Sequence, residues 1–539
     1  MQSRHVGGGF SMSYRLRAVR AFVPLVGFFL MGGVLLAAMA VFDWLVITRL
    51  VTERAAGIEG AAITVTFLLA WAILRGMFAF LRAGRLGPVT DAVAVAPDDQ
   101  PELWEQVRAA ADVTGQRPPD ELFLDAEVNA SVVEQSRLLG LLHGRRRMFL
   151  GLPLLAGLTV PQLRAVLVHE FGHYGNRDTR LGGVTARGRQ ALIHTVEAFQ
   201  EGSTRFHYVI GVLYVGYARM FLRITQSAAR HQELAADRMA ARYAGRDVTA
   251  AALRMLPVLD AAHTHYLQTY AAMGSPLGAL PPAGEVHGGF RRLLAARNGE
   301  QLAALRAGQR PPRPHPYDSH PPLAERIALI EQLPADDRPE QSTADPAAEP
   351  PALALVRDPD QVFAALEACT LAPEAALLRR MSWDDLTMAR AVADAEEWSG
   401  PLRLAVARTL RSEAPAETAD ERLLPGLEEI LDAFDRGLLW MEIADRMPKP
   451  YQAARLTGQS ARNFIRPRIF DGIAGLIHLR LADSGHVAPD IAWSGQPGLI
   501  LPESWEKGMD DAIDAAVADT PDTAPLRTLL AEGYGSGPA

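Results

Sequence analysis

Apolar residues are concentrated near the start of the chain, in two stretches that a short polar connection separates. The first covers residues 21–47 and the second residues 60–81, and each is long enough to cross about 30 Å of hydrocarbon as a helix. The first stretch is too long for the apolar core of a cleaved signal peptide. We therefore predict a membrane anchor of two transmembrane helices over residues 1–85; the alternative is a buried helical hairpin of a soluble protein.

Arginines flank these two stretches unevenly. Four arginines precede the first stretch and three lie at the end of the second, whereas the connection holds two arginines together with Glu53. Because positive charge favours the cytoplasmic side of a membrane, both outer flanks are expected in the cytoplasm. The chain after residue 85 is then expected to start on the cytoplasmic side of a cell (inner or plasma) membrane.

The remainder of the chain divides at a segment rich in proline, alanine and acidic residues. This segment, residues 336–352, is expected to be a linker. It separates a mixed domain over residues 86–335 from a helical region of unknown role over residues 353–539, which carries no catalytic signature. A further apolar segment, residues 206–224, is interrupted by two charged or polar side chains, so we favour a membrane-associated or buried helix over a full span.

Short strands precede a strongly patterned helix in the mixed domain. Residues 121–133 are strand-like in pattern, and residues 146–155 predict a strand that runs into a turn. A helix is expected to begin near Thr159, because Thr159 and Gln162 have the spacing of a capping box. Gly175 is the expected stop. The predicted fold class is mainly α with a small β-sheet (α+β).

The composition limits the kinds of molecule that the chain is expected to bind and the compartment in which it is expected to fold. The chain has 539 residues, of which 49% are hydrophobic and 22% charged, and its formal net charge is −8. No basic patch is expected, so nucleic acid is not a predicted partner. Cys369 is the only cysteine, which excludes an intrachain disulfide and fits a reducing compartment.

The expected helix contains two histidines four residues apart, with a glutamate directly after the first. On a helix, His169 and His173 share one face and can aim at one tetrahedral metal ion. Glu170 is rotated by about 100° from His169, where it can take a proton from the attacking water and pass it to a leaving amine. The alternative is two structural histidines beside a solvated glutamate.

A catalytic zinc site needs a third protein ligand from elsewhere in the chain. Glu233 can supply it, and Asp237, one helical turn later, can hydrogen-bond a ligating histidine. A solvated pair of helical acids is the alternative interpretation of these two residues. Three histidines are rival third ligands by spacing: His194, His207 and His231.

Four motifs follow one another in an order typical of a known family. They are Asn129-Ala130, then His169-Glu-Phe-Gly-His173 with Asn-Arg-Asp178 after it, then Glu233-Leu-Ala-Ala-Asp237, then Asp-Ser-His320-Pro-Pro-Leu-Ala-Glu-Arg-Ile. Together they resemble the integral-membrane zinc metalloproteases that include HtpX and the CAAX prenyl proteases. The resemblance covers about residues 120–330. Ser131 and Val132 stand where the family commonly has Phe-Ala.

The resemblance implies a role for each matching residue. His169, His173 and Glu233 are the implied ligands of one Zn²⁺ per chain, and Glu170 is the implied general base and acid. Five further roles are implied: Asp237 and Asp178 support the ligands, Asn129 and Ala130 pair with an extended substrate at a strand edge, and His320 donates to the oxyanion. His320 is also interpretable as a loop cap beside two prolines.

These expectations together predict a membrane-anchored zinc endopeptidase. It contains a zincin-like domain at the cytoplasmic face of the bilayer and acts on proteins or peptides. By analogy with HtpX-like members, its role is membrane-protein quality control. The competing hypothesis is a non-catalytic membrane-bound interaction or scaffold protein that acts through its helical C-terminal region.

Overall fold

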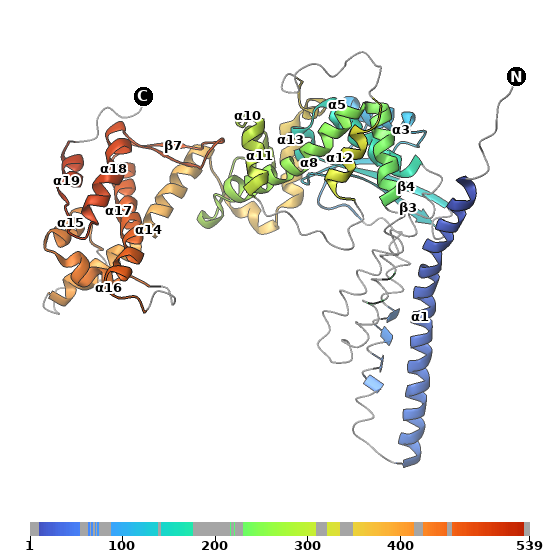
Figure 1. Ribbon diagram of the computed structural model, residues 1–539, viewed down its shortest axis with the longest axis horizontal. Coiled ribbons are helices and arrows are strands. Elements are labelled where there is room, and N and C mark those ends of the chain that lie inside the picture. Colours follow the sequence, from blue (N-terminus) through green and yellow to red (C-terminus); the bar gives the residue numbers. More distant parts are fainter. Residues whose placement is uncertain are drawn as a thin grey trace. The chain divides into compact units, whose positions relative to one another are not determined.

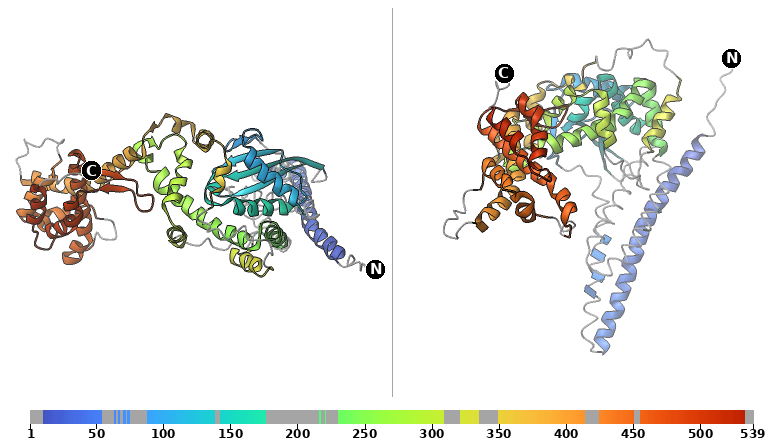
Figure 2. Two further views of the ribbon diagram at one scale, coloured as in Figure 1. Left: turned by 90° about the horizontal axis from the view of Figure 1, so that it is seen from above. Right: turned by 60° about the vertical axis from the view of Figure 1, so that its left-hand side comes forward.

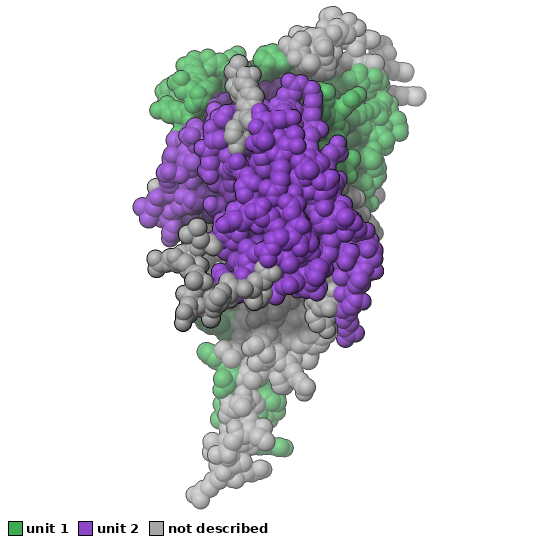
Figure 3. All heavy atoms as spheres, turned by 90° about the vertical axis from the view of Figure 1, so that its left-hand side faces the viewer, with its two compact units in different colours: residues 1–264, 298–370 green, residues 265–297, 371–539 purple. Residues whose placement is uncertain are grey.

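The structure is a computed structural model of the chain, and it is mainly helical with small sheets, consistent with the α+β class (Figure 1). It divides into two compact units (Figure 3). Unit 1 comprises residues 1–264 and 298–370, and unit 2 comprises residues 265–297 and 371–539. The described residues are 10–53, 88–137, 142–175, 230–308, 321–334, 349–413, 424–449 and 455–532, with single positions between 63 and 74 and at 216 and 220.

The first predicted apolar stretch forms part of one long helix, α1 (Phe10–Glu53). Its section Phe29–Arg49 has a mean hydropathy of 2.2, and only 6% of it is buried. By length and composition this is the one helix among the described residues that is able to cross a membrane. The large side chains of this section, such as Leu30 and Trp44, are exposed.

The other two apolar segments lie mostly outside the described residues. In the second predicted span, the few described positions are helical, and the Thr66 hydroxyl donates a hydrogen bond of 2.5 Å to Asp43 Oδ1 of α1. Of residues 206–224, only two positions are described, so the prediction for that segment is untested.

A four-stranded mixed sheet forms one layer of unit 1 (Figure 2). Its strands are β1 (Val93–Val95), β2 (Glu121–Asp125), β3 (Ala130–Arg137) and β4 (Leu142–Gly151), in the order β1-β2-β4-β3. β2 and β4 are parallel, and the other two pairs are antiparallel. The strands predicted within 121–133 and 146–155 are confirmed, and β3 lies at an edge of the described sheet.

The chain leaves β4 into a short helix, α4 (Leu152–Gly157), and not into the predicted turn. Gly151 makes this junction possible, because a Cβ there would lie 1.6 Å from the Glu127 carbonyl oxygen. The Gly151 N–H donates to the Asn129 carbonyl over 2.9 Å. The first residues of β3 are therefore held against the start of α4.

The next helix, α5 (Val160–Gly175), begins as the sequence predicts. The Thr159 N–H donates to Gln162 Oε1 over 3.0 Å, and the Gln162 N–H lies 3.5 Å from Thr159 Oγ1. This reciprocal pair is a capping box, which satisfies two backbone donors that the helix itself leaves unpaired. Leu163, Leu167 and Phe171 are fully buried, so the apolar side of α5 faces the core.

Two further helices and α8 (Arg246–Tyr266) complete the region around α5. The helix over residues 230–244 crosses α5 so closely that a Cβ on Gly172 would lie 3.1 Å from the Ala236 Cα. Helix α12 (Leu323–Glu331) packs on these helices through one small core. The buried members of that core are Ala241, Ala250, Leu253 and Ile330.

The last residues of the predicted linker and the segment after it pack onto unit 1. Pro351 forms an isolated bridge with Thr159, and the Ala352 N–H donates to the Leu158 carbonyl over 2.7 Å. Farther along, the Gln100 side chain exchanges two hydrogen bonds with the backbone of Arg357, of 2.6 Å and 3.0 Å. We call residues 349–358 the strap, because they join the start of α5 to the start of α3 (Pro101–Val113).

The helical C-terminal region is expected to begin at residue 353. Unit 1 extends past this point, to residue 370. It includes the strap and α13 (Pro359–Thr370), whereas residues 265–297 belong to unit 2. Two further elements complete unit 1: α11 (Gly299–Gly308) and the 3₁₀ turn η4 (Ala352–Leu355).

Unit 2 is built on two long helices, α14 (Trp383–Glu413) and α17 (Gly458–Asp483) (Figure 2). They approach closely at Gly475, where a Cβ would lie 2.6 Å from the Ala395 carbonyl oxygen. Their common core also includes Ile430, Phe434 and Trp505. The other elements are η2 (Leu267–Ala271), η3 (Ser275–Leu277), β5 (Ala279–Leu280), α9 (Glu285–Gly288), α10 (Phe290–Ala296), η5 (Pro373–Leu377), β6 (Arg379–Arg380), α15 (Leu427–Asp435), η6 (Leu439–Ile443), α16 (Ala444–Arg446), β7 (Ala488–Asp490), β8 (Gly498–Ile500), α18 (Glu503–Ala516) and α19 (Ala524–Ala531).

The strap makes a first testable prediction. Gln100 is buried, and Gln100→Ala leaves the backbone N–H and C=O of Arg357 without their partner. We expect the free energy of local opening of the strap to fall by about 1–3 kcal/mol. Amide hydrogen exchange of residues 352–358 measures it.

Gln106→Ala is the matched control for this prediction. Gln106 lies on the same helix but bonds only an exposed arginine side chain, Arg164, over 3.0 Å. Its replacement is expected to change the same exchange rates by less than about 0.5 kcal/mol. Equal protection of the strap in all three proteins would contradict the role assigned to Gln100.

Candidate metal centre

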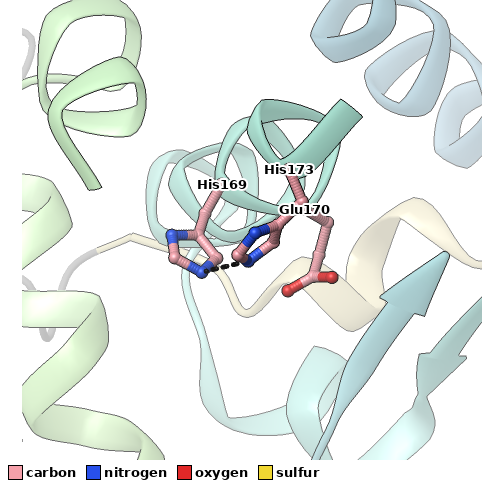
Figure 4. A group of neighbouring side chains, drawn as sticks. All are labelled: His169, Glu170 and His173. Carbon is pink, nitrogen blue, oxygen red and sulfur yellow. Dashed lines mark hydrogen bonds between the residues drawn. The ribbon is translucent and has the colours of Figure 1, made fainter. Parts of the chain in front are cut away.

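The two histidines of α5 project their rings towards one another. Their Nε2 atoms lie 3.2 Å apart, and the rings are nearly perpendicular, with centroids separated by 4.8 Å. Figure 4 shows both rings and the Glu170 carboxylate on the same side of α5. His169, Glu170 and His173 each offer one ligand atom within 4.8 Å of the others. The spacing predicted from the helical period is thus present in the structure.

Glu233 brings a carboxylate to the same place from the helix over residues 230–244. Its Oε1 lies 3.5 Å from His173 Nε2, and its Oε2 lies 3.7 Å from His169 Nε2. For a tetrahedral ion with ligand bonds near 2.0–2.1 Å, neighbouring ligand atoms are separated by about 3.3 Å. The three separations, 3.2, 3.5 and 3.7 Å, are close to that value, so one ion can be shared by all three side chains.

Asp237, one helical turn after Glu233, contacts the opposite nitrogen of the first histidine. Its Oδ1 lies 3.0 Å from His169 Nδ1, the geometry of a carboxylate that fixes the ring orientation of a ligand. Burial alone would raise the pKa of Asp237, but hydrogen bonds from Arg326 and His169, with the positive charge of Arg326, lower it to about 2. Asp237 is therefore an anion at neutral pH.

Arg326 on α12 is the residue of this centre to which sequence reasoning gave no role. Its guanidinium donates to both Asp237 oxygens, from Nε over 2.8 Å and from Nη2 over 2.7 Å. Nη1 lies 3.4 Å from Glu233 Oε2, and Nη2 lies 3.4 Å from His169 Nε2. An arginine within the apolar run of α12 was the available signal, because a buried guanidinium needs an acidic partner.

The charges of these residues favour a divalent cation. The centre combines three carboxylates, those of Glu170, Glu233 and Asp237, with one guanidinium. With neutral imidazoles, their formal charge is −2, and a divalent ion would balance it. The donor set of two imidazoles and one carboxylate is one that zinc uses in catalytic sites. The residues present therefore fit a zinc ion.

A cavity of about 160 Å³ opens beside the centre. Glu170, Asn129 and Ala130 all line it, so the residues expected to act on a substrate share one space with the first histidine. Asn129 is exposed, and its Oδ1 accepts a hydrogen bond of 2.8 Å from the Ala130 N–H at the start of β3. Ala130 is thus the first residue of the edge strand β3, and Asn129 directly precedes the strand.

Four of the histidines and acids considered from sequence are not placed by the structure. Asp178, His194, His207 and His320 lie outside the described residues. His231 is described, and it is exposed two positions before Glu233. Among the two described rivals for the third ligand position, the measured distances to both Nε2 atoms favour Glu233.

The comparison with protein families agrees with this geometry. Residues 97–333 match the model of peptidase family M48. This part of the chain is similar to that family, which contains HtpX and the CAAX protease-type zinc metalloproteases. Peptidase family M48 is a metallopeptidase family, so the resemblance found in the motifs is confirmed. No curated protein and no solved structure gives a significant match to the chain.

The M48 match encloses every described residue of the centre. It begins before α3 and ends after α12, the helix that carries Arg326. Helix α1, the strap and the helices of unit 2 after residue 371 lie outside it. The part of the chain that matches the family therefore has neighbours on both sides that the match does not cover.

Arg326 makes the second testable prediction. Arg326→Gln leaves the carboxylates of Asp237 and Glu233 buried without their cation. We expect a loss of about 3–5 kcal/mol in the local stability of α12 and its neighbours, because a buried charge then has no compensation. Hydrogen exchange of the helix over residues 230–244 measures the loss.

Arg254→Gln is the matched control, since Arg254 forms an exposed ion pair with Glu331 at the other end of α12. Exposed pairs contribute little, so its loss is expected to cost less than about 1 kcal/mol. If both substitutions cost the same, the Asp237–Arg326 pair does not stabilise the centre as inferred here.

Proposed function

We propose that unit 1 is a zinc-dependent endopeptidase anchored in a membrane. One observation supports the zinc assignment above all: His169, His173 and Glu233 place three donor atoms at the separations of tetrahedral ligands, within a region of a metallopeptidase family. Asp237 supports this donor set at the His169 Nδ1 atom, and Arg326 pairs with the carboxylates of Asp237 and Glu233. The substrates are then proteins or peptides.

The chain's own residues divide the chemistry of hydrolysis between them. When bound, zinc supplies a Lewis acid that polarises a carbonyl and lowers the pKa of water. Glu170 takes the proton from the attacking water and passes it to the leaving amine, which its place in the cavity beside His169 supports. Asp237 accepts the His169 Nδ1–H, so that Nε2 of that ring is left as the ligand atom.

The substrate backbone is proposed to pair with the edge of the sheet. β3 is the edge strand of the described sheet, and Asn129 and Ala130 stand where it meets the cavity. Free backbone groups of an edge strand can bind an extended peptide as an added strand. His320 as an oxyanion donor and Asp178 as a support of the ligands remain proposals that rest on the sequence motifs.

Helix α1 supports the membrane part of the proposal. Its apolar section, Phe29–Arg49, is exposed in the structure and long enough to cross hydrocarbon. With the second apolar stretch it would make a two-helix anchor over residues 1–85, and the arginine distribution places the catalytic unit at the cytoplasmic face. A membrane-bound protease on that side is suited to damaged or misassembled membrane proteins, and we propose quality control as its role.

The side of the membrane on which unit 1 lies is a third testable prediction, and Cys369 allows it to be tested. It is the only cysteine, and it is exposed on α13 of unit 1. A membrane-impermeant maleimide is expected to leave Cys369 unlabelled in intact cells and to label it in inside-out vesicles. Cys369→Ser is the control for labelling elsewhere. Labelling in intact cells would place unit 1 on the outer side.

Glu170 makes a fourth testable prediction. Wild-type protein in detergent with zinc is expected to hydrolyse an unfolded protein such as casein. Glu170→Gln is expected to lose at least about a hundredfold of that rate while it retains bound zinc, because proton transfer contributes about 10²–10⁴-fold. The rate is followed by release of labelled peptides, and the metal content by elemental analysis.

Glu105→Gln is the matched control, since Glu105 is an exposed acid on α3. It should cleave casein at the wild-type rate, and a chelator should abolish that cleavage until zinc is restored. Equal activity in wild type and Glu170→Gln would indicate a contaminating protease. No casein hydrolysis by the wild type, with zinc bound and the fold intact, would contradict the enzyme proposal and favour the scaffold hypothesis.

A further inference from the structure

The apolar section of α1 contains one acidic side chain. Between Phe29 and Arg49, Asp43 is the only carboxylate, and it lies six residues before Arg49, about 9 Å along a helix. An ionisable side chain at such a depth in hydrocarbon is unfavourable, so it is rarely found there without a role. None of the proposed catalytic roles uses Asp43, which lies outside the residues 97–333 that match the peptidase family.

Asp43 takes part in the contact between α1 and the second apolar stretch. In that stretch, Thr66 is half-buried and Ile73, seven residues later, is buried. Phe67 and Trp71 lie on the other side of the same stretch and are 67% and 61% exposed. This helical period places Thr66 on the side that faces α1, where its hydroxyl donates to Asp43 Oδ1 over 2.5 Å. The two apolar stretches are therefore joined by a polar contact within their apolar sections.

The carboxyl group of Asp43 can accept more hydrogen bonds than Thr66 supplies. Its two oxygens offer about four acceptor sites when ionised, and the Thr66 hydroxyl has one proton to donate. Among the described residues, Thr66 is the only one that hydrogen-bonds Asp43. The same hydroxyl lies 2.9 Å from the Ile63 carbonyl, so it keeps an acceptor when a stronger donor displaces it from Asp43. Asp43 is therefore able to accept a second donor.

The surface beside Asp43 is open to a neighbouring helix. Phe42 and Trp44, the residues on either side of it along the chain, are 47% and 68% exposed. Asp43 itself is half-buried, so its carboxyl group lies at the border between the contact with Thr66 and this open surface. A cationic side chain is the donor that this group favours most, because a charge-assisted hydrogen bond is about twice as strong as a neutral one. The charge of Asp43 therefore selects for lysine or arginine.

We propose that Asp43 is an intramembrane recognition site for a lysine or arginine side chain on a transmembrane helix of the substrate. The inference rests on the proposed membrane anchor and adds a substrate class to the proposed quality control. In an assembled membrane protein, a cationic side chain within the bilayer pairs with an acidic partner in its own bundle. When that partner is missing, the cation is left in hydrocarbon, and Asp43 offers it a carboxylate at the surface of the anchor. The site therefore distinguishes an unassembled helix from an assembled one.

The test measures the capture of a model helix by full-length Glu170→Gln protein in liposomes, so that no substrate is lost to cleavage. The model helix is a single apolar span with a photocrosslinking residue, and it carries Lys, Arg, Leu or Glu at the depth of Asp43. The Lys and Arg helices are expected to crosslink at least about fivefold more than the Leu helix, which is the size of a polar contact between helices in a membrane. The Glu helix is expected to crosslink least. A Lys placed two turns deeper is the matched control and should give the level of the Leu helix.

Two substitutions separate recognition from the packing of the two apolar stretches. Asp43→Asn keeps an oxygen for the Thr66 hydroxyl and removes the charge, so the preference for Lys and Arg is expected to disappear. Thr66→Val removes the hydrogen bond and leaves the carboxylate, so the preference is expected to remain. Thr48→Val is the matched control, because the Thr48 hydroxyl bonds carbonyl groups of α1 itself over 2.9 Å. A preference that survives in Asp43→Asn, or that Thr66→Val abolishes as completely, would show that Asp43 only packs the anchor.

Casein hydrolysis separates this inference from the endopeptidase. With Glu170 intact, Asp43→Asn is expected to cleave casein in detergent at the wild-type rate, which also shows that the variant is folded. Lys-dependent capture without casein cleavage by the wild type would overturn only the endopeptidase. Casein cleavage with equal capture of all the helices would overturn the recognition site and leave the endopeptidase standing. Release of the protein from the membrane by alkaline extraction would overturn the anchor and the recognition site together.

Discussion

The buried pair of Asp237 and Arg326 is the interaction on which the centre depends. Arg326 reaches from α12 to a carboxylate on the helix over residues 230–244, and that carboxylate in turn contacts His169 on α5. Three helices from distant parts of the sequence are thereby held by one chain of charged contacts. A buried carboxylate of this kind is stable only with a compensating cation, so the position of α12 and the orientation of the His169 ring are set together.

Close backbone packing complements this pair. Gly172 lies between the two histidines, and any side chain in its place would contact Ala236 more tightly than most Cβ atoms contact a neighbour. Ala236 lies between Glu233 and Asp237 on its own helix. The glycine of the His-Glu-Phe-Gly-His motif therefore fixes how near Glu233 comes to both rings.

Local features of the centre were predictable from the sequence, and long-range ones were not. The capping box of Thr159 and Gln162, the shared face of His169 and His173, and the short strands all follow from spacing within a few residues. Glu233 could be proposed, but distance along the chain could not separate it from the rival histidines. Arg326 belongs to a recognised motif, but sequence reasoning assigned it no role. Its partners Asp237 and His169 are 89 and 157 residues away along the chain. The residues of α8 that line the cavity have no local signal, since Ala252 and Leu253 look like ordinary core residues until the fold brings them beside Glu170.

The strap shows that the boundary of a family match is not the boundary of a folded body. The match ends at residue 333, yet the start of α5 is joined to Pro351 and Ala352, and the start of α3 is joined to Arg357. A fragment cut at the end of the match would expose the backbone groups of Leu158 and the side chain of Gln100 to solvent. A piece that keeps α5 capped and covered thus has to include the strap, and residues 265–297, which belong to unit 2, tie it to the chain after residue 371 as well. The region that matches the family is therefore smaller than the region that folds together. A fragment of this chain has to be designed from the folded region.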